Sequence, residues 1–151
     1  MPDFLWGAPG SPYTLLTTEL NSLQTGWGTA LGPEIDNSTN KWQVCRLELL
    51  IASNSLAFTA ASRARVFLLP RQNDGSYPHY VSGATPRLAE ANYFAGGISI
   101  HPATVSAQVI RESAQDVWLP QGRFRAVLFW TGPTLPASGN TLLAVPTPLA
   151  S

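Results

Sequence analysis

The stretch WQVCRLELLIAS, residues 42–53, decides the fold, because it carries the clearest periodic pattern in the chain. Every second side chain of this stretch is apolar, so these side chains are expected to share one face. That face contains Cys45, Leu47, Leu49 and Ile51. The opposite face includes the charged residues Arg46 and Glu48. A period of two with one apolar face predicts a β-strand that is buried on that side.

Shorter patterns of the same kind recur along the chain, and glycine and proline separate them. They predict strands over residues 63–69, 92–100, 104–111, 123–130 and 141–145. The glycine pair at positions 96 and 97 is expected to interrupt the second of these strands. In the third strand, the face expected to be shared is that of Val105, Ala107 and Val109. In the fourth strand, it is that of Phe124, Ala126, Leu128 and Trp130.

Residues 14–25 are ambiguous, because their leucines have helical spacing while their threonines favour a strand. We expect a strand there, with an open alternative of a helical turn from Thr18 to Leu23. Residues 26–41 and 70–90 are rich in turn-forming residues and are expected to be loops. Six to eight short strands without a long helical period predict an all-β fold, an antiparallel β-sandwich. The sandwich is expected to be a single domain over residues 14–151.

Residues 1–13 form a different kind of segment, in which three prolines exclude a continuous helix. We expect an extended N-terminal arm. The arm carries large apolar side chains that a solvated tail does not normally display: Phe4, Leu5, Trp6 and Tyr13. These residues are therefore expected to contact either their own domain or a neighbouring protein.

The charge of the chain excludes several functions. Nine basic and nine acidic residues give a net charge of zero, and charged residues make up 12% of the chain, about half the usual share. The eight arginines are scattered and the one lysine is Lys41, so nucleic-acid binding is not expected. No apolar run is long enough to cross a membrane, and the first residues do not resemble a secretory signal. A low surface charge suits a protein that packs against other proteins.

Residues that carry catalytic chemistry are sparse and separated. His79 and His101 lie 22 positions apart, and neither has metal-site spacing with the single cysteine, Cys45. No nucleophile elbow, phosphate-binding loop or dinucleotide motif is present in the sequence. We therefore expect no enzyme, no catalytic residue, no cofactor and no metal. The enzyme alternative would need one of the histidines to meet an acidic residue in a cleft.

The five tryptophans are the remaining signal for a binding function. Trp42 and Trp130 fall in predicted strands and are expected in the core. Trp6 and Trp27 fall in glycine-rich segments, so they are candidates for contact with a partner. Trp118 precedes the turn LPQG, and both placements stay open for it.

Six phrases, taken in order, resemble small virion structural proteins of tailed bacteriophages, of the capsid decoration or cement type. They are LLTTELNSL (15–23), GPEIDNST (32–39), VFLLP (66–70), DGSYP (74–78), LPQGRFR (119–125) and ASGNTL (137–142), and the leucine-rich strand after Trp42 stands between the second and the third. The resemblance covers most of residues 15–143. It implies a jelly-roll-like sandwich that binds the outer surface of the head, clamps neighbouring capsomers and forms a homotrimer.

The resemblance also implies that the major capsid protein is the partner, and that the protein is made in the bacterial host cytoplasm and located on the virion. The partner-binding residues are expected to be Phe4, Leu5, Trp6, Tyr13 and Trp27. No nucleic acid, membrane or small-molecule substrate is expected. Two alternatives stay open. One is a carbohydrate- or receptor-binding sandwich of a tail fibre or baseplate, and the other is a tail-tube or neck component.

Overall fold

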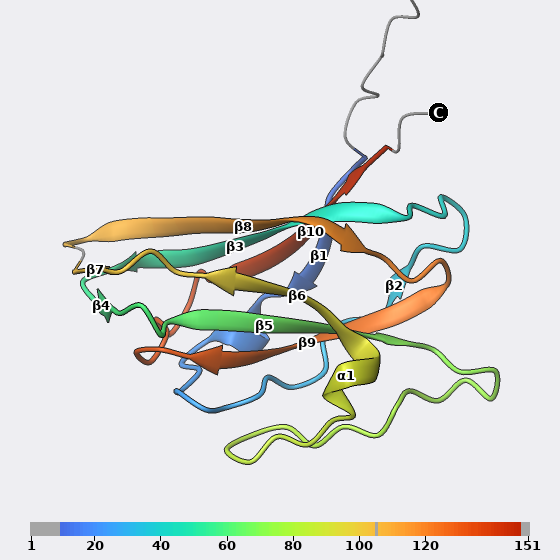
Figure 1. Ribbon diagram of the computed structural model, residues 1–151, viewed down its shortest axis with the longest axis horizontal. Coiled ribbons are helices and arrows are strands. Elements are labelled where there is room, and N and C mark those ends of the chain that lie inside the picture. The colour runs from blue at the N-terminus through green and yellow to red at the C-terminus, as the bar shows by residue number, and fades with distance from the viewer. Residues whose placement is uncertain (1–9, 105, 149–151) are drawn as a thin grey trace, which may run out of the picture.

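Two antiparallel sheets of four strands each pack against one another in the computed structural model (Figure 1), which describes residues 10–104 and 106–148. Sheet A contains, in spatial order, β1 (Tyr13–Leu16), β10 (Thr141–Thr147), β3 (Val44–Asn54) and β8 (Gln108–Trp118). Sheet B contains β2 (Ile35–Asp36), β9 (Arg123–Thr131), β5 (Arg63–Pro70) and β6 (Phe94–Ser99). The expected all-β antiparallel sandwich is confirmed.

Four short elements complete the described fold. A small sheet pairs β4 (Ala57–Phe58) with β7 (Ala103–Thr104). A 3-10 helix covers Thr18–Leu20, so the helical turn considered for this region is present, directly after β1. The helix α1 (Glu90–Tyr93) precedes β6, and the sequence pattern did not predict it.

The strands of the two main sheets are paired in a nested order. The first strand, β1, pairs with the last, β10, and β2 pairs with β9. Next inward, β3 pairs with β8, and the innermost pair is the hairpin of β5 and β6. The chain therefore follows the path of one long hairpin that is wound through both sheets.

The main core lies between the sheets and follows the predicted alternation. In β3, Cys45, Leu47 and Ile51 are fully buried, and Leu49 is nearly so. In β9, the expected inner face is also buried: Phe124, Ala126, Leu128 and Trp130. Trp42 precedes β3 and is half-buried against this core, so its predicted position inside a core strand is wrong.

A second apolar cluster lies on the outer face of sheet B, where the sequence pattern alone indicated no cover. It consists of Phe67, Leu69, Val127 and Phe129, which are all buried. The segment 71–93, between β5 and β6, passes over them and contributes Tyr77, Tyr80, Leu88 and Tyr93. Figure 1 shows this segment and α1 beside β5 and β9, on the side away from sheet A. We call residues 71–93 the cover segment.

The predicted strand at 104–111 is wrong in its bounds and its facing. β8 begins at Gln108, and Val109 is 39% exposed. Ala107 has a φ of 51°, a left-handed conformation that interrupts a regular alternation. Val105, which was expected on the same face, lies outside the described residues.

The expected break at Gly96-Gly97 is also wrong, because β6 runs through both glycines. A Cβ atom at Gly96 would lie 3.0 Å from Cγ2 of Val117 in the other sheet. Glycine therefore permits the close approach of β6 to β8 and does not end the strand.

Candidate partner-binding surfaces

Of the five predicted partner-binding residues, the structure describes Tyr13 and Trp27. Phe4, Leu5 and Trp6 lie outside the described residues. Tyr13 begins β1 and is half-buried, and its hydroxyl donates to Oδ1 of Asn37 at 3.2 Å. The last residues of the expected arm are thus attached to the sandwich, and Tyr13 has a structural contact there.

Asn37 is a fully buried polar residue that connects three segments at this end of the sandwich. Its Nδ2 donates to the carbonyl oxygens of Trp42 and Pro120, each at 2.8 Å. Its Oδ1 accepts from the backbone amide of Trp42 at 3.0 Å as well as from Tyr13. The sequence placed Asn37 in the expected loop over residues 26–41 and did not indicate its burial, because its partners Tyr13 and Pro120 are distant in sequence.

The N-terminal segment meets the sandwich beside Trp42. The amide of Gly10 donates to the carbonyl of Pro146 at 3.0 Å, so residue 10 still runs alongside the end of β10. A Cβ atom at Gly10 would lie 2.8 Å from the Trp42 ring, which leaves room for glycine alone. The path of the chain is therefore fixed at Gly10, the first of the described residues.

Trp27 is 37% exposed, in keeping with a surface position, but it lies at the other end of the molecule. Its carbonyl accepts from the amide of Trp130, seven residues along β9 from Arg123. Seven strand residues span roughly 23 Å. Because Arg123 pairs with Asp36, next to Asn37, the structure does not bring Trp27 together with Tyr13.

In the described part of the chain, the most exposed large apolar side chains are Trp118, at 69%, and Phe94, at 54%. Trp118 is the last residue of β8 and Phe94 the first of β6. Both line a groove of about 530 Å³, which we call the Phe94–Trp118 groove. Its other lining residues include Pro70, Arg71, Pro120 and Arg123. The sequence left Trp118 undecided and gave no signal for Phe94, because the groove forms only when β6 and β8 meet.

A charged network borders this groove. Nη1 of Arg123 lies 3.2 Å from Oε1 of Glu34, and its Nε lies 3.2 Å from Oδ2 of Asp36. Arg71 is less closely paired, since its Nη1 lies 3.8 Å from Glu34. The Tyr77 hydroxyl donates to Glu34, and this bond, followed by the nearby arginines, holds the pKa of Glu34 below its usual value. The groove thus combines aromatic walls with two arginines, 38% and 47% exposed, that are already paired with Glu34 and Asp36.

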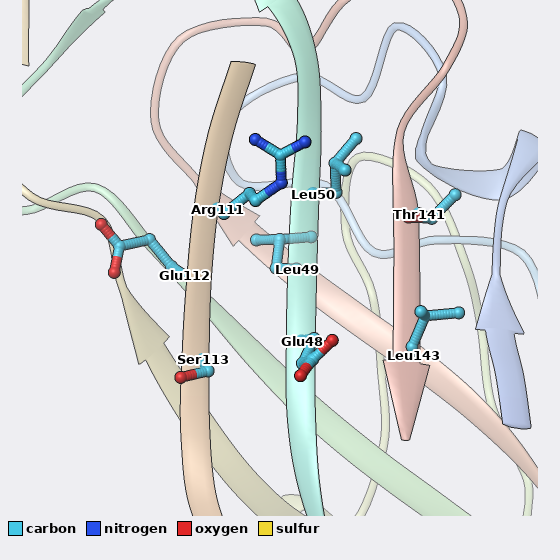
Figure 2. A pocket seen from close by; sticks show the side chains of 8 residues that line it. All are labelled: Glu48, Leu49, Leu50, Arg111, Glu112, Ser113, Thr141 and Leu143. Carbon is cyan, nitrogen blue, oxygen red and sulfur yellow. The ribbon is translucent and has the colours of Figure 1, made fainter. Parts of the chain in front are cut away.

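A second depression, of about 310 Å³, lies across β8, β3 and β10 in sheet A (Figure 2). Its lining mixes charges of both signs, such as Glu48 and Arg111, with half-exposed leucines, such as Leu50 and Leu143. Glu48 is already paired with Arg46 at 2.5 Å. This surface has no exposed aromatic pair, so it is the weaker candidate for a partner.

Within the described ranges, no group of three or more His, Cys, Asp or Glu side chains is placed to hold a metal ion, and no helix is long and apolar enough to span a membrane. His79 and His101 are both exposed. Burial raises the pKa of the Cys45 thiol to about 12, so this thiol stays neutral and unreactive near pH 7. Similarity to known proteins adds no candidate residue: no family model, no curated protein and no solved structure matches the chain.

Proposed function

We propose that the protein is a bacteriophage capsid decoration, or cement, protein that binds the outer surface of the head. The observation that carries this proposal is the Phe94–Trp118 groove, whose two aromatic side chains are 54% and 69% exposed. Exposed aromatic residues beside a groove are typical of a surface that a protein partner covers. The resemblance of six sequence phrases to small virion proteins supplies the kind of partner, the major capsid protein.

The nested strand order supports the jelly-roll part of the proposal. A jelly roll has eight strands in two antiparallel sheets and occurs in viral capsid domains. The eight strands of sheets A and B pair first with last and inward to the β5–β6 hairpin, which agrees with this architecture.

Attachment would depend on apolar burial and on repeated contacts. Burial of apolar surface contributes roughly 25 cal/mol per Å². In the proposed homotrimer, three such contacts would meet one rigid lattice, so the second and third would form at high effective concentration. The low charge of the chain, with 12% charged residues, limits the cost of removing charges from water at such contacts.

The test is binding to purified heads of the encoding phage, prepared without the decoration protein and imaged by electron cryomicroscopy. Wild-type protein is expected at high copy number on the outer surface. The double variant Phe94→Ser/Trp118→Ser should lose most of its occupancy, while Val109→Ser, an exposed apolar position at the opposite end of β8 from Trp118, should keep it. Absence of wild-type protein from the heads would refute the function. Full occupancy by the double variant would show that the groove is not the surface that binds the head.

A second candidate is a carbohydrate-binding module of a tail fibre or baseplate. The observation that favours it is the presence of polar Asn92 and Gln121 in the same groove as Trp118. A flat aromatic ring beside amide groups can stack on a sugar and hydrogen-bond its hydroxyls. A glycan array distinguishes the candidates, because a cement protein gives no bound glycan and a carbohydrate module gives one that Trp118→Ser loses.

A further inference from the structure

We propose that Asp116 is a positioning residue for partner binding, because its left-handed backbone turns Trp118 out of the sandwich. The inference rests on the proposed function and deepens it, since it identifies what builds the most exposed wall of the Phe94–Trp118 groove. Asp116 has a φ of 55°, which is uncommon for a residue other than glycine. Such backbone conformations cluster at functional sites, and this one lies two residues before Trp118.

The pairing of β8 with β3 contains one extra residue at this point. On β3, Arg46 alone separates Cys45 from Leu47. On β8, both Gln115 and Asp116 separate the partners of Cys45 and Leu47. Two residues opposite one form a β-bulge, which bends the strand locally and changes the direction of the side chains that follow. The left-handed Asp116 is therefore the place where β8 takes up its extra residue.

The exposure of the β8 side chains changes phase across the bulge. Before the bulge, the half-buried positions are 110, 112 and 114. After the bulge, the buried residue is Val117, which is 3% exposed and belongs to the main core. A strand without a bulge would continue the earlier phase, with residues 116 and 118 directed inward and residue 117 outward. The bulge therefore buries Val117 and leaves Trp118 69% exposed.

The contact between β8 and β6 supports this direction of Val117. A Cβ atom at Gly96 would lie 3.0 Å from Cγ2 of Val117, so glycine on β6 faces valine on β8 at close range. This contact lies directly beside the groove, since Phe94 is two residues before Gly96 and Trp118 is one residue after Val117. Figure 1 shows the end of β8 near the start of β6. With Val117 held between the sheets, Trp118 is left outside as a wall of the groove.

The first test measures the exposure of Trp118 in solution, without heads, in full-length protein that carries fluorine-labelled tryptophan. The fluorine NMR resonance of Trp118 is identified by its loss in Trp118→Phe, and its shift between light and heavy water reports contact with solvent. Asp116→Ile should reduce this shift to that of Trp130, which is 1% exposed, because a β-branched residue disfavours a positive φ. Asp116→Gly, which accepts a positive φ, should keep the wild-type shift.

Two further variants separate positioning from a loss of stability. Ala107→Ile is the matched control, because Ala107 also has a positive φ, of 51°, but lies at the other end of β8. It should lower stability without changing the exposure of Trp118. Deletion of Asp116 removes the extra residue and leaves a regular ladder, in which Val117 still points inward and Trp118 outward. This deletion should keep the wild-type exposure, and it tests the inference even where Asp116→Ile does not fold.

Binding to purified heads is the second measurement. Asp116→Ile should weaken binding roughly ten-fold or more, as expected when a central aromatic residue is withdrawn from a contact. Asp116→Gly, the deletion of Asp116 and Ala107→Ile should bind as wild type does. Retained binding after the deletion would show that Asp116 acts through Trp118 and does not itself contact the head. Circular dichroism and thermal unfolding show which variants remain folded.

Several outcomes overturn the inference. They are an exposed Trp118 in folded Asp116→Ile, a buried Trp118 after deletion of Asp116, and wild-type head binding by Asp116→Ile. Bulges also protect edge strands against pairing with other chains, and β8 is an edge strand of sheet A. Self-association of Asp116→Ile with Trp118 still exposed would assign the bulge to that role instead. The proposed function fails separately, when wild type does not bind heads, and the solution test still decides the direction of Trp118.

Discussion

The outer faces of the two sheets are made compatible with water in different ways. On sheet B, Phe67 and Phe129 point away from the main core, and the cover segment buries them. Their ring centroids lie 4.7 Å apart. On sheet A, the outer face carries Arg46, Glu48 and half-exposed Leu50 around a shallow depression, and no segment in the described ranges forms an apolar cluster on it.

This difference shows that the chain buries the outer face of sheet B and leaves the outer face of sheet A exposed. The cover segment adds a third layer, so stability on that side comes from buried aromatic surface. Sheet A has charged residues at alternate positions of β3, which keep an uncovered sheet face compatible with water. Substitutions on the two faces should therefore have unequal effects, and four experiments compare them.

The largest effect is expected from Phe67→Ala under the cover segment. Phe67 is fully buried, so its truncation should lower the free energy of unfolding by about 3–5 kcal/mol. Leu50→Ala on the outer face of sheet A, where the side chain is half-exposed, should cost about 1 kcal/mol. Urea denaturation measures both. Equal losses would mean that the two faces do not differ in the way described.

Gly28→Ala tests how closely the cover segment is packed. An added Cβ would lie 2.6 Å from the Tyr80 hydroxyl oxygen and 2.7 Å from Cβ of Pro86, both in the cover segment. The resulting displacement should cost about 1–3 kcal/mol and speed amide hydrogen exchange in residues 71–93. Gly122→Ala is the matched control, because nothing lies within 4 Å of its added Cβ. Unchanged exchange in Gly28→Ala would contradict close packing.

Tyr80→Phe removes a single hydrogen bond that fastens the cover segment to the loop before β2. The Tyr80 hydroxyl donates to the carbonyl of Thr29 at 2.5 Å, and its loss should cost about 1 kcal/mol. Tyr93→Phe is the control, since no hydrogen bond of its hydroxyl is found in the described ranges. Burial raises the pKa of Tyr80 to about 12, so wild type should lose stability from pH 10 upward, and Tyr80→Phe should lose less. Identical alkaline unfolding curves of wild type and Tyr80→Phe would show that Tyr80 does not cause the loss of stability at high pH.

Glu34→Gln should have the smallest effect on stability, and this effect should appear only at acidic pH. The hydrogen bond from Tyr77 and the nearby arginines lower the pKa of Glu34 from its usual value of 4.5. A lowered pKa in the folded state stabilises the protein above pH 4.5, and this contribution is lost as the pH falls through the folded value. Thermal unfolding between pH 6 and pH 2 should therefore depend less on pH in Glu34→Gln than in wild type. Glu48→Gln on sheet A is the comparison, and an equal flattening there would refute the role of the Tyr77 contact.

The sequence predicted the strands whose pattern is local. β3, β5, β9 and β10 lie within a few residues of their predicted bounds, because period-two alternation is visible in each. β8 was predicted too early and too short, since the left-handed residue Ala107 breaks the pattern before it. Its exposed and half-exposed residues then give no continuous apolar face to detect.

The candidate site was less predictable, because its parts are distant in sequence. Trp118 was noticed as an aromatic residue before a turn, but Phe94 becomes significant only when β6 lies beside β8. The structural role of Asn37 was not predicted for the same reason, since its partners include the distant Pro120 as well as Trp42. The burial of Phe129 was missed, because a strand pattern does not report a third layer.

The pairing of β1 with β10 has a consequence for when the protein can fold. Sheet A cannot be completed until residue 147 has left the ribosome, because β10 lies between β1 and β3. The β5–β6 hairpin and its cover segment are synthesised earlier and contain the most local strand pair of the nested order. We expect structure to begin there and to extend outward, with slow closure by the terminal strands, because distant pairings lose the most chain entropy. During synthesis, β1 and the apolar residues before it in the sequence therefore lack the partner strand β10 until residues 141–147 have been made.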